Sequence, residues 1–534
     1  MNLTHFWRWS LALLTLVAMP VTGVAAAGVP AALRLPAVLS DNMILQQDKP
    51  AQIWGWAPPG KAVTVQLATQ KKTATASGEG RWSVKLDPLK AGGPYELTVV
   101  ADTALTVKNV LVGEVWLASG QSNMVVTLAE SANGAAEIQA AKFPQIRLFK
   151  TKFHAPDAPA DDLEGKWVEC TPQTAGGFSG VAYFFGRELH QNLKVPVGLI
   201  QSAHGATPAE NWVSLAGLKS EASLKPLVDK HDEMPKDSKG WDPQLPTGLY
   251  NGEIAPLTPL ALRGFIWYQG ETNGGRAAQY RTLFPLLIKD WRKAFGEDLP
   301  FYFVQLANHM DAKAEPVDEA WAELREAQTL ALTLPQTGMA VAIDVGDAKG
   351  IHPKNKQDVG HRLALNALAR TYGQKVEYSG PMYQAMKVEG DKIRLTFAHV
   401  GKGLDARGGA LKRFAIAGED KKFVWGEAVI DGDTVVVSSA KVAKPVAVRY
   451  AWANNPEGCN LYNKDGLPAA PFRTDDFPMI TAGQSGYTAT GKPWTPPPPI
   501  AVDPNAKLTG NTIQVIVGKP VIRTWDHVRA TDYV

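Results

Sequence analysis

Cysteine is scarce in this sequence, with only Cys170 and Cys459 among 534 residues. The two lie far apart in the chain, so we expect free, buried thiols, although an oxidising compartment would permit a disulfide. Neither cysteine belongs to a regular spacing of histidines, which argues against a structural zinc site. We therefore expect no metal and no cofactor.

A charge excess of one sign is also missing. Lys and Arg number 55 against 52 Asp and Glu, and the formal net charge is +3. No basic run is present, which disfavours nucleic acid and anionic membrane surfaces as partners. The chain is 45% hydrophobic and 20% charged, as ordinary globular proteins are. Its length is too great for one core, so roughly two to four domains are expected.

Long hydrophobic runs are absent beyond the N-terminus. Arg8 precedes a short apolar stretch over residues 11–19, and three alanines follow at 25–27. This order predicts a signal peptide over residues 1–27. A membrane anchor is the alternative, but the apolar stretch is short and interrupted. We expect a periplasmic or secreted protein with no membrane association after signal removal.

The texture of the sequence changes along the chain. Residues 28–111 show short strands and turn signals, which predict an N-terminal β-sandwich. Residues 112–372 alternate apolar strands with helical patterns and predict an α/β layered sheet. Strand texture returns over residues 373–480 and predicts a second β-domain. Residues 481–534 hold a proline-rich linker and an unassigned tail with one predicted strand at 512–517.

The α/β segment carries the chemically suggestive residues. Its predicted strands are 112–118, 197–202, 264–267, 301–306 and 339–343. The clearest predicted helices are 280–294 and 356–370. Each suggestive motif follows one of these strands. Ligands bind at the carboxyl ends of strands in open α/β sheets, so these motifs are expected to converge.

The strongest motif is the serine that follows the first of these strands. Residues 119–124 read Ser-Gly-Gln-Ser-Asn-Met, and they place Ser122 in the turn before a helical segment. A serine there can expose its hydroxyl, while its own N–H faces a developing anion. An ordinary strand-to-helix turn with serine as N-cap is the alternative.

Three ordered blocks resemble the sialate O-acetylesterase family, a branch of the SGNH-hydrolase superfamily. The first is residues 119–124. The second, residues 266–273, reads Ile-Trp-Tyr-Gln-Gly-Glu-Thr-Asn, and the third joins 344–347 to the histidine segment 351–356. The resemblance covers residues 35–476 and implies an SGNH-hydrolase-like three-layer α/β/α domain flanked by β-sandwich domains.

The resemblance implies a serine esterase that uses Ser122 as nucleophile and His352 as general base. A serine hydroxyl is too weak an acid to lose its proton unaided. An imidazole that titrates near neutrality can accept that proton and return it to the departing sugar hydroxyl. A surface or packing role is the alternative for a histidine.

Oxyanion donors are expected from three places. They are the Ser122 amide, the Gly205 amide and the Gln269 side chain. The family usually has two glycines before the threonine of the second donor segment, whereas this chain has Gly205 followed by Ala206. A satisfied structural amide is the alternative for Gln269.

The third member of a triad has several candidates. Related hydrolases carry a carboxylate two or three residues before the histidine, where this chain has Gly350 and Lys349. We favour Asp347 and keep Asp344 and Glu271 as candidates, each of which can instead brace a loop. A backbone carbonyl orienting the histidine, and hence a Ser–His dyad, is a further alternative.

The expected substrate is an acetylated carbohydrate, such as a sialic acid or a plant polysaccharide of the xyloglucan or xylan type. A lipase or thioesterase of the same superfamily is the rival activity. A non-catalytic carbohydrate-binding protein is the rival class. A second Gly-Gln-Ser triplet ending at Ser485 follows no apolar strand and is expected to be solvated linker. The sequence leaves the oligomeric state open.

Overall fold

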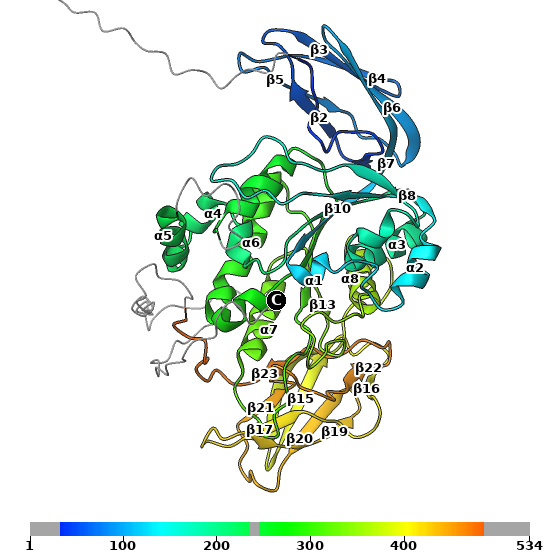
Figure 1. Cartoon of the computed structure of the whole chain (residues 1–534). Helices are drawn as coiled ribbons and strands as arrows, with labels where there is room; N and C mark the ends of the chain where they lie inside the picture. The colour runs from blue at the N-terminus through cyan, green and yellow to red at the C-terminus, as the bar shows by residue number, and fades with distance from the viewer. Residues whose placement is uncertain (1–31, 235–244, 485–534) are drawn as a thin grey trace, which may run out of the picture.

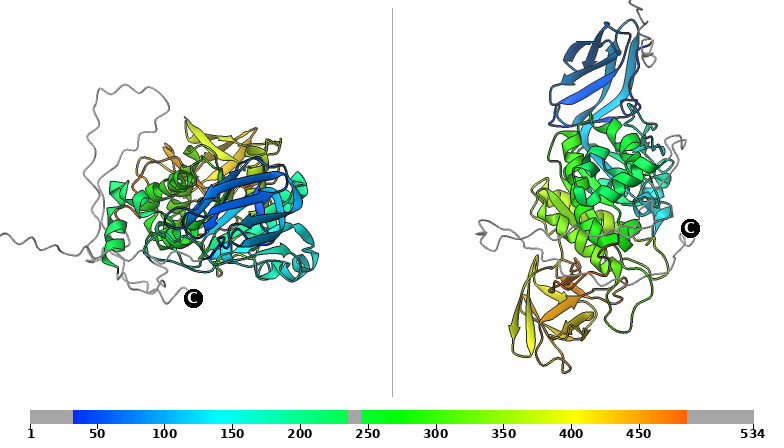
Figure 2. Two further views of the ribbon diagram at one scale, coloured as in Figure 1. Left: turned by 90° about the horizontal axis from the view of Figure 1, so that it is seen from above. Right: turned by 90° about the vertical axis from the view of Figure 1, so that its left-hand side faces the viewer.

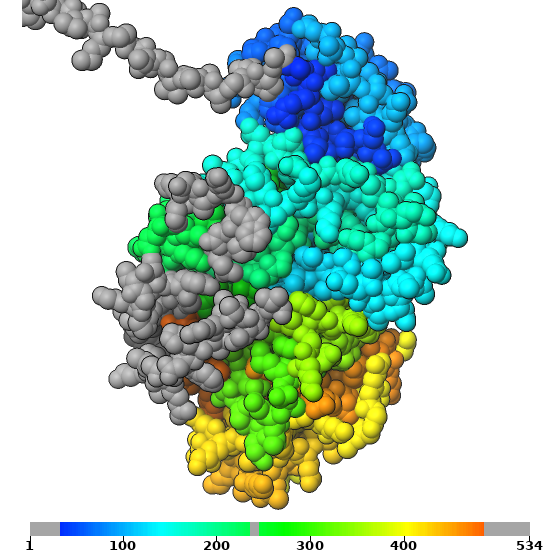
Figure 3. Space-filling view, viewed as in Figure 1, coloured from blue at the N-terminus to red at the C-terminus, as the bar shows by residue number. Residues whose placement is uncertain are grey.

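The computed structural model describes residues 32–234 and 245–484 in three stacked blocks (Figures 1 and 2). The expected signal peptide, most of the linker, Ser485 and the strand predicted at 512–517 lie outside the described residues. In the space-filling view the N-terminal β-block lies above the α/β block, and the C-terminal β-block lies below it (Figure 3). Among the described helices, none combines the length and apolarity needed to cross a membrane.

A seven-stranded path forms the central sheet. Its strands in spatial order are β13 (Thr337–Val341), β12 (Phe301–Gln305), β11 (Gly264–Tyr268), β7 (Ala104–Gly120), β10 (Val197–Ala203), β8 (Phe143–Lys150) and β9 (Trp167–Cys170). Neighbours pair in parallel except β9, which is antiparallel to β8. The strands β10 to β13 are buried along their whole length. Burial on both faces is typical of a parallel sheet covered by helices.

Helices cover both faces of this sheet (Figure 1). One pair is α3 (Gly180–Leu193) and α8 (Gln357–Arg370), and the other is α6 (Ala277–Phe295) and α7 (Ala320–Leu330). Ser179 caps α3 by accepting a hydrogen bond from the Ala182 N–H at 3.2 Å. The prediction of a layered α/β fold with added β-regions is therefore confirmed. The predicted strands and helices are present, although the last strand starts two residues early, at Thr337.

Short helices fill the connections. They are α1 (Ser122–Val125), α2 (Gly134–Ala140), α4 (Leu215–Lys219) and α5 (Lys225–Glu233), with the 3₁₀ turns η1 (Ala175–Gly177), η2 (Ala209–Trp212), η3 (Ala222–Leu224), η5 (Ala255–Leu257), η6 (Glu271–Arg276) and η7 (Ala331–Thr333). One further element, η4 (Tyr250–Ile254), is a π-helix. Such elements are rare and occur frequently at functional sites.

The N-terminal β-block shares a strand with the central sheet. Its own strands are β1 (Ile44–Gln46), β2 (Ala51–Trp56), β3 (Ala62–Leu67), β4 (Gln70–Thr75), β5 (Arg81–Leu86) and β6 (Gly92–Val100). The first part of β7 pairs with β6, and its second part enters the central sheet between β10 and β11. The boundary expected between residues 111 and 112 thus falls inside one continuous strand.

The C-terminal β-block has its own hydrophobic cluster. It contains three sheets. The first consists of β14 (Met382–Glu389), β15 (Lys392–Ala398), β20 (Thr434–Ser438) and β19 (Glu427–Asp431), and the second of β18 (Val424–Trp425), β17 (Phe414–Ala417), β21 (Ala447–Tyr450) and β23 (Phe472–Arg473). The third is the pair β16 (Leu404–Ala406) and β22 (Leu461–Asn463). Alternation in β15 and β20 buries Ile393, Leu395, Val435 and Val437 between the sheets.

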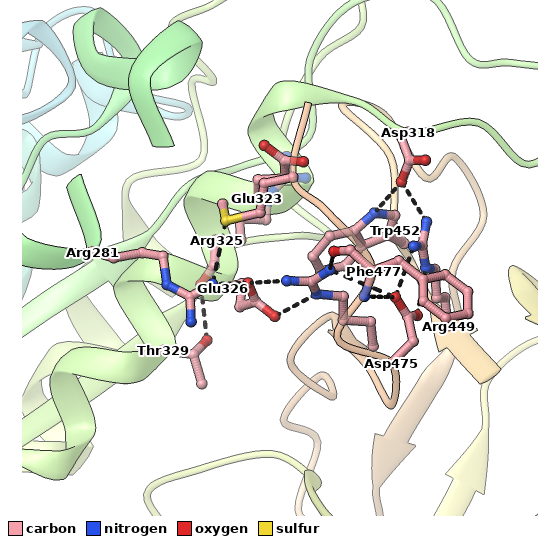
Figure 4. Close-up of polar contacts among 12 residues, drawn as sticks. Arg281, Asp318, Glu323, Arg325, Glu326, Thr329, Arg449, Trp452, Asp475 and Phe477 are labelled. Atoms are coloured by element: carbon pink, nitrogen blue, oxygen red, sulfur yellow. Dashed lines mark hydrogen bonds and ion pairs between the residues drawn. The ribbon is translucent and has the colours of Figure 1, made fainter. Parts of the chain in front are cut away.

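A cluster of ion pairs joins this block to the α/β block (Figure 4). Arg449 of β21 donates two hydrogen bonds to Asp475, at 2.8 and 2.9 Å, and also pairs with Asp318 in the segment before α7. Arg473 of β23 donates two hydrogen bonds to Glu326 of α7, at 2.7 and 3.1 Å. Fork-shaped pairs of this kind fix orientation as well as distance. The C-terminal sheets are therefore held against α7 in one arrangement.

We predict that Asp475→Ala lowers the free energy of unfolding by about 3 kcal/mol, because it leaves a buried guanidinium without its main partner. The Arg449 and Asp475 side chains are only 6% and 1% exposed. Asp161→Ala is the control, since it breaks a pair with Arg81 in which both side chains are 51% exposed. That change should cost less than about 1 kcal/mol in urea unfolding. Equal losses in the two variants would contradict the prediction.

Candidate active site

Three parallel strands of the central sheet end at the same level. Gly120 at the end of β7 lies beside Ala203 at the end of β10 and beside Tyr268 at the end of β11. The residues that follow these ends include Ser122, Gly205 and Gln269. The convergence expected from the sequence is therefore present for these three residues, at the carboxyl edge of the sheet.

The turn that presents Ser122 depends on a glycine. Gly120 has φ +131°, and a Cβ atom there would lie 2.2 Å from the Tyr268 carbonyl oxygen. The Gln121 N–H donates to the same carbonyl at 2.9 Å. The Gln121 side-chain oxygen accepts from the Thr272 N–H at 3.2 Å. The chain is thus held against the end of β11 on both sides of the turn.

Ser122 is the first residue of α1, not its cap. The N-cap position belongs to Gln121, whose side chain makes no capping bond. The Ser122 side chain is partly exposed and makes no hydrogen bond to any of the described residues. A capping role therefore does not account for this serine.

The histidine segment packs against the residues that follow the nucleophile. The Asn123 side-chain nitrogen donates to the Ile351 carbonyl oxygen at 3.0 Å, and the Ala132 N–H donates to the Lys354 carbonyl oxygen at 2.7 Å. His352 lies between these two contacts and keeps part of its surface exposed. The partial burial of its ring, followed by the positive charge of Lys356, lowers the pKa of His352. This shift favours the neutral imidazole, which has a lone pair for a proton.

Gly205 lies beside Ser122. A Cβ atom on Gly205 would lie 3.7 Å from the Ser122 Cβ atom. Within the described part of the chain, the N–H groups of Ser122 and Gly205 donate no backbone hydrogen bond. Ala206, the next residue, has φ +56° and so adopts the left-handed conformation. Both amides remain available to an oxyanion.

Gln269 has the contacts of a structural amide. Its side chain is fully buried, and its nitrogen donates to Asn273 Oδ1 at 2.6 Å and to the Thr207 carbonyl oxygen at 3.3 Å. Its oxygen accepts from the Tyr280 hydroxyl at 3.0 Å. Both of its N–H groups are used within the protein. The geometry therefore favours the structural alternative for this residue.

Asp347 and Asp344 have the contacts of loop-bracing carboxylates. Asp347 Oδ1 accepts from the Lys349 N–H at 2.9 Å. Asp344 accepts two hydrogen bonds from Arg362, at 2.6 and 2.8 Å. Among the described residues no carboxylate makes a hydrogen bond or ion pair with His352, although the charge of Glu130 acts on its pKa. The geometry therefore favours the dyad alternative.

Glu271 belongs to a buried polar network around Asn123, the residue after Ser122. Its Oε1 accepts from Asn123 Nδ2 at 2.6 Å, and Lys356 Nζ donates to Asn123 Oδ1 at 2.6 Å. Burial raises the pKa of Glu271 and lowers that of Lys356 to about 7. Glu271 is thus directed at the amide next to Ser122, and its other oxygen has no hydrogen-bond partner among the described residues.

The sequence interpretation missed a histidine–carboxylate pair at this edge. His204 Nε2 lies 2.5 Å from Glu253 Oε1, and Glu253 is fully buried in the π-helix η4. The His204 ring stacks on Trp212 with an interplanar angle of 9°. His204 directly precedes Gly205, which is a signal the sequence contains. The pairing with Glu253 has no local signal, because only the fold brings the two residues together.

Neither cysteine forms a disulfide. Cys170 is buried and Cys459 is half-buried, and burial raises the pKa of each thiol to about 12. Across residues 32–234 and 245–484, no three His, Cys, Asp or Glu side chains are grouped so that they could hold a metal ion.

We predict that Asp347→Asn keeps turnover within about fivefold of the unmodified protein, because an amide oxygen can still accept the Lys349 N–H. A triad aspartate behaves differently, since its conversion to asparagine typically lowers kcat by about 10⁴. The measurement is kcat on a chromogenic acetyl ester. Asp344→Asn is the structural control and should lower the melting temperature, because it disrupts the pair with Arg362. A near-complete loss of turnover in folded Asp347→Asn would contradict the prediction and support Asp347 as the third member of a triad.

Comparisons with known proteins show which proteins this chain is similar to. Residues 112–369 match the model of a carbohydrate esterase family described as sialic acid-specific acetylesterase. The chain is 33% identical over 491 residues to a human sialate O-acetylesterase, a match that covers 82% of this chain and 92% of the human protein. A mouse sialate O-acetylesterase is 31% identical over 509 residues, covering 82% and 94% of the two chains.

A solved structure extends the likeness to the fold. A carbohydrate acetylesterase from Xanthomonas citri superposes with a TM-score of 0.77 at 43% sequence identity. The match covers 83% of this chain and 99% of that protein. It therefore includes the β-blocks on either side of the central sheet as well as the sheet itself.

Proposed function

The chain belongs to the sialic acid-specific acetylesterase family of carbohydrate esterases and is a carbohydrate O-acetylesterase, and we propose that it works by a Ser122–His352 mechanism. The observation that carries the proposal is the shared level at which β7, β10 and β11 end. Support also comes from the nearness of Gly205 to Ser122 and from the Gly205 N–H, which donates no backbone hydrogen bond among the described residues. The Asn123–Ile351 contact adds the histidine segment.

Acetyl transfer to the enzyme is the first half of the reaction. His352 takes the proton from Ser122 Oγ as this oxygen attacks the acetyl carbonyl carbon. The negative oxygen of the tetrahedral intermediate accepts hydrogen bonds from the Ser122 and Gly205 amides. When the intermediate collapses, the bond to the sugar oxygen breaks and His352 gives its proton to that oxygen. The products are a deacetylated sugar and an acetyl-serine.

Water completes the cycle. His352 removes a proton from water, the hydroxide adds to the acetyl-serine carbonyl, and the same amides stabilise the second intermediate. Collapse breaks the bond to Ser122 Oγ, which regains its proton from His352. Acetate leaves, and the enzyme returns to its starting state.

The electrostatics of the site set the expected pH dependence. A base works only in its deprotonated form, so activity rises with pH through the pKa of His352. Partial burial and the charge of Lys356 lower that pKa from its ordinary value of 6.5, while the charge of Glu130 acts in the opposite direction. Activity should therefore persist below pH 6.5.

His204 directly precedes Gly205, and it supports the oxyanion site by holding the Gly205 N–H in place. Its N–H donates to the Gly120 carbonyl oxygen at 3.1 Å, and its carbonyl oxygen accepts from the Thr207 hydroxyl at 2.8 Å. Its side chain lies against Glu253. Because His204 is anchored at its backbone and at its ring, the next N–H is held in a fixed direction. Such preorganisation is the main requirement of an oxyanion site.

The substrate class that we propose is an O-acetylated sialic acid or plant polysaccharide such as xyloglucan or xylan. Support comes from relatives named sialate O-acetylesterase and from the carbohydrate acetylesterase of Xanthomonas citri. Acetate release from a panel of these glycans distinguishes the alternatives. The apolar stretch and small residues near the N-terminus support export to the periplasm or the medium.

We predict that Ser122→Ala lowers kcat by about 10³-fold or more, as removal of a catalytic serine does elsewhere. A fluorophosphonate probe should label the unmodified protein and fail to label this variant. Ser119→Ala is the matched control, because Ser119 lies three residues away and its buried hydroxyl has no partner among the described residues. It should keep its activity and its labelling. Turnover near normal in Ser122→Ala would refute the mechanism.

We predict that His204→Ala lowers kcat by about 10-fold or more, since a full oxyanion donor is typically worth 10²–10³. A thionoacetyl ester, whose sulfur accepts hydrogen bonds weakly, should lose less than the oxygen ester. The kcat/KM value for the oxygen ester divided by that for the thionoacetyl ester should therefore fall. His361→Ala is the control, because it removes a histidine–carboxylate pair with Glu188 at the surface. An unchanged ratio in His204→Ala would assign His204 to folding alone.

A further inference from the structure

Lys356 is a fully buried lysine that the proposed chemistry does not use. It occupies the N-cap position of α8, four residues after His352, and its side chain has no exposed surface. Removing an ammonium group from water carries a large free-energy penalty unless it is paired and hydrogen-bonded. The position of this charge in the molecule therefore needs a reason.

The charge is satisfied by the amide next to the nucleophile. Lys356 Nζ donates to Asn123 Oδ1 at 2.6 Å and lies 5.4 Å from the centre of the Tyr268 ring. Glu271 lies on the other side of the same amide and accepts from Asn123 Nδ2 at 2.6 Å. The amide dipole thus runs between a positive and a negative group. Such chains of hydrogen bonds polarise and strengthen one another in a buried site.

The same amide joins the two reacting segments. Asn123 directly follows Ser122, and its nitrogen also donates to the carbonyl oxygen of Ile351, which directly precedes His352. We propose that Lys356, acting through Asn123, is a positioning residue that aligns Ser122 with His352. This proposal rests on the catalytic roles proposed for Ser122 and His352.

The charge of Lys356 has a second, electrostatic effect on the base. Three charged or titratable groups act on His352. Lys356 and His309 disfavour its protonated form, and Glu130 favours it, while partial burial disfavours it most. The positive charge of Lys356 therefore favours the neutral imidazole, which can accept the serine proton. Removal of that charge must raise the pKa of His352.

Three variants separate positioning from simple structural support. Lys356→Gln keeps an N–H for Asn123 Oδ1 but removes the charge, whereas Lys356→Met removes both. Lys354→Met is the matched control, because Lys354 lies on the same segment but is exposed. The measurement is kcat/KM on a chromogenic acetyl ester between about pH 5 and pH 9, with the full chain.

The proposal predicts a different pH profile for each variant. In Lys356→Gln the midpoint of the acid limb moves up by about half a pH unit or more, as loss of a like charge requires, and kcat on the plateau falls less than in Lys356→Met. Lys356→Met shows the same shift together with a fall of about 10-fold in kcat, because the amide loses its anchor. Lys354→Met leaves the profile unchanged.

Two controls keep the test decisive. If Lys356→Met does not fold, the double variant Lys356→Met/Glu271→Met removes both buried charges and should fold, and its acid limb must also move up. An unmoved acid limb in folded Lys356→Gln would overturn the proposal. Activity in Ser122→Ala would instead overturn the proposed function itself, so the two failures are distinguishable.

Discussion

At the carboxyl end of β7 the backbone passes so close to the Tyr268 carbonyl that a side chain at Gly120 has no room. The rest of the site depends on this close approach. It aligns the ends of β7 and β11, and the Gly120 carbonyl in turn accepts a hydrogen bond from the N–H of His204, which follows β10. The proposed nucleophile and the two proposed backbone donors therefore all lie close to one point of the central sheet. A rigid sheet edge holds them more precisely than free loops would.

Much of this arrangement could be predicted from the sequence. The serine segment, the Trp-Tyr-Gln segment and the histidine segment each follow an apolar strand, and parallel strands present their carboxyl ends at one edge. Side-chain partners were harder to foresee. Whether Gln269 faces an oxyanion or Asn273 and Tyr280 is decided by packing between distant segments. Likewise, the contacts of Asp347 with its own loop have no signature in the local sequence.

The site also contains several polar groups that stability alone does not explain. Asn123, Glu253 and Lys356 have almost no exposed surface, and Glu271 has a buried oxygen without a hydrogen-bond partner among the described residues. Networks of this kind specify a single arrangement when every member is satisfied, and they are costly when one member is missing. Their concentration around Ser122 indicates that geometry, more than stability, shaped this part of the protein. Strain and buried charge commonly gather at sites that perform chemistry.

The continuity of β7 limits how this architecture can be rearranged. Its first part completes the N-terminal sheet by pairing with β6, and its last residue is the glycine that turns the chain toward the nucleophile. A cut between the two blocks would expose a row of unpaired peptide groups on the strand that carries the active-site turn. The N-terminal β-block therefore cannot be exchanged between proteins as a free module.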